Sequence, residues 1–355
     1  MQALDSKIIS NLRFLLIVGV VLIHSGIEMN IPLSQYTVYK FFIEDAIIGT
    51  VTRVCVPLFF LFSGYLFFAN IENFSKKVYW EKISKRSKSL FIPYLFYNTF
   101  AIILFGTIGL LYPQMQSGAT PPVQTWTCNT IISLYWDYGS NLPIVPQFWF
   151  IRNLMVMVLV SPIIYYLIKK MGCLGVLIVI GLWIGNVWEF GIPGTMGLSF
   201  FILGAYLGLK KISLYNLACK LKMVGGLYPI GVLFDICTKQ FTFNIYIHNV
   251  VILLGLIFWI FIVGTLLKKG RMKSNNFLAE SAFFIFAMHE PYMGKFKHLC
   301  YNILPNLVDS QLLVQFQLIF YYFVIAFIWI SILVVLFYSI KKISPKFAIF
   351  ICGGR

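Results

Sequence analysis

The sequence predicts an all-α, polytopic membrane protein with about ten transmembrane helices and both termini in the cytoplasm. Of its 355 residues, 59% are hydrophobic and 11% are charged, whereas about 25% of residues are charged in an average soluble domain. The mean hydropathy is +0.84. The apolar residues form runs of spanning length, and clusters of Lys and Arg separate many of them. These observations exclude a soluble globular protein.

The apolar runs give the order of the expected helices. A span needs about 20 mostly apolar residues, and ten runs are close to this length. The fifth to seventh runs have the weakest bounds, because Gly and Pro recur from 185 to 208. The expected spans are 8–26, 46–69, 89–112, 147–168, 172–190, 195–209, 223–239, 246–267, 277–294 and 314–340.

We expect one membrane domain over residues 1–355, with no appended soluble domain. The first run lacks a small-residue cleavage site after it, which favours a retained helix over a signal peptide. The longest outer connection, 113–146, contains an amphipathic stretch at 129–138 that is typical of a helix lying on the membrane surface. We find no internal repeat, and this weakens an inverted-repeat transporter.

The basic residues set the orientation. The net charge is +16, and its distribution follows the positive-inside rule rather than a nucleic-acid-binding pattern. With the N-terminus inside, 21 of the 28 Lys and Arg residues lie on the inner side and 4 on the outer side. Three lie within spans: Arg13, Arg53 and Arg152. We therefore expect a multi-pass protein surrounded by membrane lipids, with no nucleic-acid partner.

The first span carries two polar residues that are costly inside a membrane. Arg13 and His24 are separated by ten residues, which places their α-carbons about 16 Å apart along a helix and on nearly the same face. A central Arg costs about 2.5–3.5 kcal/mol on insertion scales. The pair therefore places a fixed positive charge near the inner surface and a titratable ring near the outer one, which suggests a transfer path across the bilayer.

Other helices place polar groups at the depth of His24. With the orientation above, Arg53, Arg152, His289 and Glu290 all lie in the outer parts of their spans. Ionisable groups inside a membrane usually face one another or a cavity. A set of His, Glu and Arg at one level suffices for general acid–base chemistry with stabilisation of an oxyanion.

These residues also have simpler structural explanations. Arg53 and Arg152 are candidate ion-pair partners for Glu290 or for Asp235, which lies at a similar depth. A lone His at a helix end, such as His248, is more often solvated or hydrogen bonded than functional.

A basic cluster precedes the third span. Lys85, Arg86 and Lys88, with Lys82 nearby, are expected to bind the phosphates of an anionic cofactor together with Arg13. The alternative is an anchor that contacts anionic lipid. The seven cysteines include no CxxC pair, so we expect neither a disulfide framework nor a metal site. Cys128 and Cys300 are the one pair that this topology would allow to bridge outside the cell.

Five ordered segments give the chain its resemblance to a known family. They are NLRFLLIVGVVLIHS at 11–25, TRVCVPLFFLFSGYLFF at 52–68, KRSKSLFIPYLFYN at 85–98, FWFIRNLMVMVLVSP at 148–162 and SAFFIFAMHEP at 281–291. Together they resemble the acyltransferase-3 family of bacterial integral-membrane O-acyltransferases, the polysaccharide and lipopolysaccharide O-acetylase type. The similarity runs from about residue 5 to 340.

The resemblance implies an activity. Family members transfer an acyl group, commonly acetyl from cytoplasmic acetyl-CoA, to a hydroxyl of an extracytoplasmic glycan or lipid-linked sugar at the bacterial cytoplasmic membrane. His24 matches the family's catalytic His, and Arg13 matches its partner in the same motif. The family's Arg-x-x-Arg signature is approximated by 85–88, where Lys takes both outer positions. Lys lacks the bidentate geometry of Arg.

Two other functions are compatible with the same residues. An exporter or flippase of a glycan or lipid-linked sugar would also use His and Arg inside the membrane, and acetyl-CoA binding would distinguish it from the transferase. A regulatory or assembly subunit with an inactive site is the third alternative, and the presence of both His24 and His289 argues against it.

Overall fold

The computed structural model describes residues 3–26, 36–113, 121–137, 142–189, 191–290, 292–303 and 310–354. All regular secondary structure in these ranges is helical, which confirms the predicted all-α class. Six helices are long and apolar enough to cross a membrane, or seven if a pair that meets at a bend of 103° is one span. The chain is therefore a multi-pass membrane protein. The count of ten spans and the cytoplasmic termini stay predictions.

The N-terminal part consists of three long helical units. The first is α1, and the other two include short stretches of π- or 3₁₀-helix and run over Thr37–Phe68 and Lys76–Leu111. Their elements are α1 (Ala3–His24), α2 (Thr37–Tyr39), π-helix η2 (Lys40–Ile48), 3₁₀-helix η3 (Val51–Val54), α3 (Cys55–Phe68), α4 (Lys76–Arg86), π-helix η4 (Ser87–Phe91) and α5 (Ile92–Leu111).

The remaining elements include spans and shorter helices. They are η6 (Val123–Thr125), α6 (Cys128–Trp136), η7 (Pro146–Phe148), α7 (Trp149–Leu159), α8 (Ser161–Ile184), α9 (Thr195–Leu209), α10 (Leu214–Lys220), α11 (Lys222–Gly225), α12 (Tyr228–Cys237), α13 (Asn244–Lys268), α14 (Asn276–Met288), α15 (Met293–Ile303), α16 (Gln311–Ile343) and α17 (Pro345–Ile351). Helix α6 overlaps the predicted amphipathic stretch 129–138, whose last residue, Tyr138, is outside the described residues.

Side-chain caps explain several helix starts. Ser75, Thr127, Ser213 and Asn275 precede α4, α6, α10 and α14, and each accepts a hydrogen bond from the backbone N–H three residues later. Such caps satisfy donors that a helix leaves unpaired at its first turn. Inside α8, Gly172 has φ 57° and ψ −134°, so the helix is interrupted there. This interruption separates the predicted spans 147–168 and 172–190.

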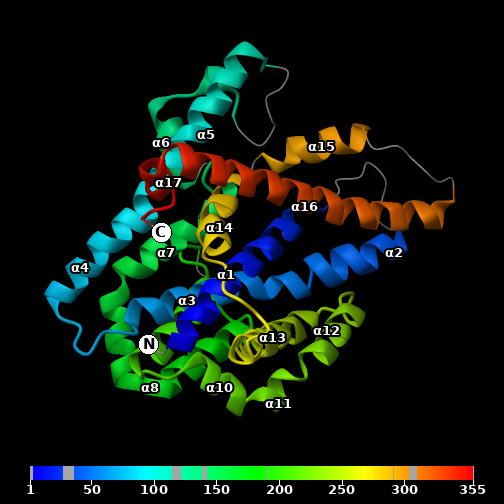
Figure 1. The fold of residues 1–355 in the computed structure, drawn as a ribbon. Coiled ribbons are helices and arrows are strands. Elements are labelled where there is room, and N and C mark those ends of the chain that lie inside the picture. The colour runs from blue at the N-terminus through cyan, green and yellow to red at the C-terminus, as the bar shows by residue number, and fades with distance from the viewer. Residues whose placement is uncertain are drawn as a thin grey trace.

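Helix α1 lies in the middle of the molecule (Figure 1). It contacts α14, α13, α3 and α16, and its C-terminal half also contacts η2 and η3. Its buried side includes Ile9, Leu16 and Val20. Two elements that carry or precede predicted site residues, η3 with Arg53 and α14 just before His289, therefore contact the helix that carries His24.

Helices α3 and α9 cross at backbone contact distance. A Cβ atom added at Gly64 would lie 2.1 Å from the carbonyl oxygen of Phe201, and one at Gly204 would lie 2.0 Å from that of Leu61. Small residues allow membrane helices to approach this closely. The crossing fixes α3, whose N-terminal extension η3 carries Arg53.

All seven cysteines are free. Cys128 and Cys300 therefore do not form the one disulfide that the predicted topology allowed.

Candidate active site

His24 ends α1, and other helices hold the backbone around it. The carbonyl of Leu22 accepts a hydrogen bond from the Tyr322 hydroxyl at 2.8 Å. Lys297 donates from its ammonium group to the carbonyls of His24, at 3.0 Å, and of Gly26, at 2.8 Å. The last carbonyls of a helix have no partner inside it, and a cation there also complements the helix dipole. α15 and α16 thus fix the position of His24.

Two predicted site residues meet the His24 ring. Its Nδ1 lies 3.8 Å from Oε1 of Glu290, and its ring centroid lies 5.2 Å from that of His289. A separation of 3.8 Å is too long for a hydrogen bond but short enough for strong attraction once the ring is protonated. The His24 side chain is 39% exposed, so a substrate can reach it. The structure brings these three residues together, and their joint catalytic role stays a prediction.

His289 is fully buried, and its ring N–H already donates a hydrogen bond within the protein. Its Nδ1 lies 2.7 Å from the carbonyl oxygen of Phe286, and a carbonyl can only accept, so Nδ1 carries the hydrogen and Nε2 the lone pair. Among the described residues, that Nε2 has no hydrogen-bond partner. His289 therefore presents an unused proton acceptor beside His24.

Gln147 fixes the segment that carries His289 and Glu290. Its buried amide nitrogen donates to the carbonyls of Phe286, at 3.3 Å, and Ala287, at 3.0 Å, and also to that of Glu290. These carbonyls belong to the C-terminal end of α14, where backbone acceptors lack helical partners. The predicted orientation places Gln147, the first residue of the 147–168 span, on the outer side, but it does not predict the contact with α14.

Arg53 brings positive charge to the same region. It is exposed, on η3, and lies within electrostatic range of His24 and of Glu44. Its helix is held by Thr50, whose hydroxyl donates to the Asp235 carboxylate at 2.8 Å. Arg53 therefore adds positive charge near the end of α1 that carries His24.

Asp235 is buried, and its partners are not Arg53 or Arg152, the two ion-pair partners suggested for it from the sequence. Its carboxylate pairs with Lys239 at 3.1 Å and His248 at 2.9 Å, and accepts from Asn244 at 2.8 Å. Neither Arg53 nor Arg152 is needed to neutralise it, so that part of the structural alternative was wrong. The hydrogen bond with Asp235 also gives His248 a structural role, as the partner of a buried acid.

Arg152 lies against the outer connection. It is buried, donates to the carbonyl of Trp136 and lies over the Trp136 ring, 5.6 Å from its centroid. It is also within electrostatic range of Tyr94 and Asp137. These contacts join α7 to α6. Its predicted depth in the membrane and its proposed action on an oxyanion both stay predictions.

A second group of cations lies near the middle of α1. Arg13 lies within electrostatic range of Arg86, whose guanidinium is 5.9 Å from the centroid of the Phe67 ring. Lys82 donates to the Phe67 carbonyl at 2.8 Å. Within the described ranges, neither Arg13 nor Arg86 pairs with a carboxylate. Two half-buried guanidinium groups without a counter-charge form a candidate anion site.

Two of the predicted cofactor-binding residues lie apart from this pair. Lys85 and Lys88 are exposed, whereas Arg86 and Lys82 are half-buried and contact Phe67. Side chains three or four positions apart share a helix face, so Lys82 and Arg86 face the protein together. Lys82, which the sequence analysis placed only in the vicinity, is the better-placed lysine.

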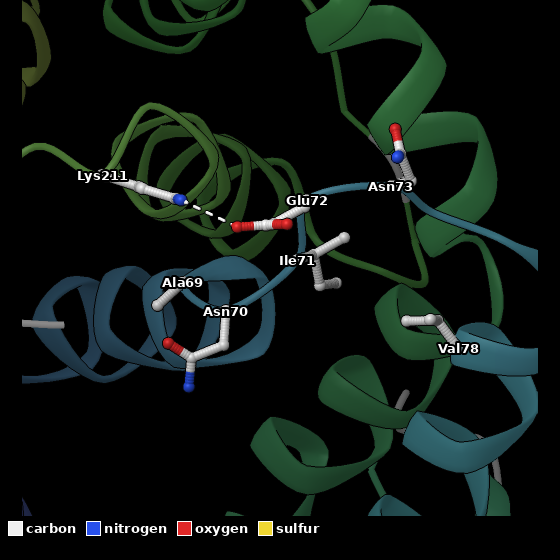
Figure 2. Close-up of a pocket in the computed structure, with 7 residues that line it drawn as sticks. All are labelled: Ala69, Asn70, Ile71, Glu72, Asn73, Val78 and Lys211. Atoms are coloured by element: carbon white, nitrogen blue, oxygen red, sulfur yellow. Dashed lines mark hydrogen bonds and ion pairs between the residues drawn. The ribbon is translucent and has the colours of Figure 1, made fainter.

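A pocket opens at the C-terminal end of α3. It has a volume of about 600 Å³, within the range of small-molecule sites. Figure 2 shows Lys211 and Glu72, which form an ion pair at 3.4 Å across one side, and Asn73 and Val78 on another. The remaining lining residues are Ala69, Asn70 and Ile71. The pocket begins directly after α3, two residues beyond the carbonyl that Lys82 binds.

Metal-binding residues do not gather in the described parts of the chain, where no three His, Cys, Asp or Glu residues are placed to hold an ion.

The fold and site define a helical membrane protein with a histidine centre at the C-terminal end of its central helix and an arginine pair near the middle of that helix. The family model described as an acyltransferase domain matches residues 7–339, and the chain belongs to this acyltransferase-3 family. The family is one of acyltransferases, so the protein is assigned as an enzyme of that class. No curated protein and no solved structure matches the chain.

Proposed function

We propose that the protein is a membrane O-acetyltransferase that moves an acetyl group from cytoplasmic acetyl-CoA to a hydroxyl of a cell-surface glycan or lipid-linked sugar. The observation that carries the proposal is the arrangement along α1, with Arg13 beside Arg86 near its middle and His24 beside His289 and Glu290 at its C-terminal end. In this proposal the protein lies in the bacterial cytoplasmic membrane with ten spans and both termini inside.

The donor binds on the inner side. Its phosphates contact Arg13 and Arg86, with Lys82 adding charge and exposed Lys85 and Lys88 attracting the anion from solution. The pocket of about 600 Å³ beside them holds the rest of the nucleotide. The pantetheine arm then extends along α1 and carries the thioester toward His24, over the axial distance of about 16 Å.

Acyl transfer takes place at the outer end. Neutral His24 removes the proton of the acceptor hydroxyl while the oxygen attacks the thioester carbonyl. Arg53 stabilises the negative oxygen of the tetrahedral intermediate, and Glu290 stabilises the protonated ring. Collapse of the intermediate breaks the carbon–sulfur bond, and His24 returns its proton to the sulfur of CoA. An alternative route passes the acetyl group through His24 itself.

Acetyl transfer by the purified protein tests the proposal. His24→Ala is expected to remove transfer with donor binding intact, and Arg13→Ala to weaken acetyl-CoA binding. Near-normal transfer by folded His24→Ala would refute the catalytic role of this ring. If the unaltered protein fails to bind acetyl-CoA, and cells lacking it fail to present an unmodified glycan at the surface, the exporter alternative replaces this proposal.

A further inference from the structure

We propose that Glu44 is an acceptor-binding residue whose carboxylate accepts hydrogen bonds from hydroxyl groups of the sugar presented to His24. This role rests on the proposed function, and it adds a residue that neither the family's motifs nor the predicted site included.

Glu44 faces the outer end of α1. A Cβ atom added at Gly26 would lie 3.3 Å from Oε1 of Glu44 and 3.1 Å from Cδ1 of Ile48. Gly26 follows His24 by two residues, and Lys297 holds the carbonyls of both. The carboxylate is therefore next to the segment that ends with the catalytic ring.

The helix that carries Glu44 is held firmly. Tyr39 and Ile43 of the Thr37–Phe68 unit are fully buried in a cluster with Tyr322, against the last turn of α1. The side-chain carbonyl of Gln315 accepts from the backbone N–H groups of Val38, at 2.8 Å, and Tyr39. π-helical segments are frequent at functional sites, and here η2 gives Glu44 a defined position.

The charges around Glu44 indicate the kind of ligand. Arg53 and Lys297 both lie within electrostatic range of it. Yet among the described residues its carboxylate has no hydrogen bond or ion pair, whereas the adjacent Asp45 pairs with Lys40 at 2.7 Å. Glu44 thus retains acceptor capacity between two cations.

A neutral polyhydroxyl ligand fits this combination best. An anion would be repelled by Glu44, and a cation by Arg53 and Lys297. A sugar hydroxyl can donate to the carboxylate and accept from a cation at the same time. Lys297 has three ammonium hydrogens and uses two on backbone carbonyls, which leaves one for a ligand. Such a site rejects analogues that lack the hydroxyl.

Kinetics of the full-length protein in liposomes test this assignment. The donor is acetyl-CoA, and the acceptor is the glycolipid and glycan extract of an envelope from cells that lack the protein. Glu44→Gln is compared with Asp45→Asn, which removes the neighbouring carboxylate on the same helix. We expect Glu44→Gln to raise the KM for the extract by about 10- to 100-fold. The KM for acetyl-CoA should stay within about twofold, as should both constants of Asp45→Asn.

The outcomes separate this proposal from the one it rests on. If the unaltered protein transfers acetyl groups and Glu44→Gln has an unchanged KM for the extract, the assignment of Glu44 is refuted and the proposed function stands. If Glu44→Gln changes the KM for acetyl-CoA as much as that for the extract, the residue does not act on the acceptor. If the unaltered protein transfers nothing, both proposals fail.

Discussion

At the scale of single residues, the two histidines of the site differ in what their rings can reach. His289 is fully buried, and its Nδ1 hydrogen is held by the Phe286 carbonyl. The backbone of His24 is clamped by Lys297, whereas its side chain is 39% exposed. Only the His24 ring is open to an acceptor hydroxyl. We infer that His24 exchanges protons with the substrate and that His289 positions it by ring contact.

Glu290→Gln is expected to lower kcat by about tenfold or more. The carboxylate lies 3.8 Å from His24 Nδ1, so it stabilises the ring mainly in the protonated state that forms during transfer. The KM for either substrate should change little, because the neutral ring gains little from the charge. Steady-state kinetics check this, with Glu280→Gln as the control, since Glu280 pairs with Lys341 before the middle of α14. Equal kcat values for Glu290→Gln and the unaltered protein would contradict the role.

The sequence supports a prediction of where each site residue lies along its helix, but not of the residues that it contacts. His24, His289 and Glu290 could be brought together because charge asymmetry sets which helix ends face outward. Charge asymmetry does not predict which way a side chain points around the axis of its helix. Arg152 is one example, since its side chain contacts Trp136. Glu44 escaped notice because a π-helix changes which side chains share a face, and no residue pattern indicated η2.

At the scale of elements, Lys297 of α15 joins this short helix to the end of α1, the helix that carries His24. We call its two hydrogen bonds to backbone carbonyls the clamp. Lys297→Met keeps the apolar stem but removes the donors to His24 and Gly26. Loss of hydrogen bonds from a charged donor costs about 1.5–3 kcal/mol, so the end of α1 should loosen. We expect kcat to fall about tenfold or more, measured beside the melting temperature.

Matched variants separate the clamp from a general effect of charge. Lys295→Met removes an exposed lysine of the same helix and should leave kcat within about twofold. Lys297→Arg keeps donors at the same place and should restore part of the rate. A rate for Lys297→Met equal to that of Lys295→Met would show that the clamp does not position His24.

The crossing of α3 and α9 makes a second prediction at this scale. Gly204→Ala places a methyl group where a Cβ would lie 2.0 Å from the Leu61 carbonyl oxygen, so the two helices must separate. Overpacking costs about 1–3 kcal/mol, although Ala otherwise favours a helix by about 0.5–1 kcal/mol. We expect a lower melting temperature. Gly181→Ala is the control, because nothing lies within 4 Å of its added Cβ, and it should be neutral or stabilising.

At the scale of the whole molecule, hydropathy predicted where helices occur better than where they end. The runs at 8–26 and 246–267 correspond to α1 and α13. The predicted span 46–69 omits the helical segment that begins at Thr37, because π- and 3₁₀-helices do not show the residue period of an α-helix. The run at 223–239 became two short helices, α11 and α12, around adjacent glycines. Glycine-rich segments lack both propensity and side-chain pattern, so tertiary contacts decide their path.

Orientation of the whole chain decides which compartment meets each end of α1, and thiol labelling tests it. Cys128 and Cys173 are both free and exposed, and one predicted span, 147–168, separates them. Cys128 begins the outer helix α6, and Cys173 follows the Lys169–Lys170 pair and the interruption at Gly172. We expect a membrane-impermeant maleimide to label a variant that keeps only Cys128 in intact spheroplasts.

The matched variant, which keeps only Cys173, should react only after the membrane is permeabilised. Equal labelling of both variants from one side would place the two thiols in one compartment, and an odd number of spans between them would be excluded. The reverse pattern would place Arg13 outside, where acetyl-CoA is absent. Because the donor and acceptor ends of the proposed reaction are fixed by this one helix, reversal would exclude transfer from cytoplasmic acetyl-CoA even if His24 proved essential.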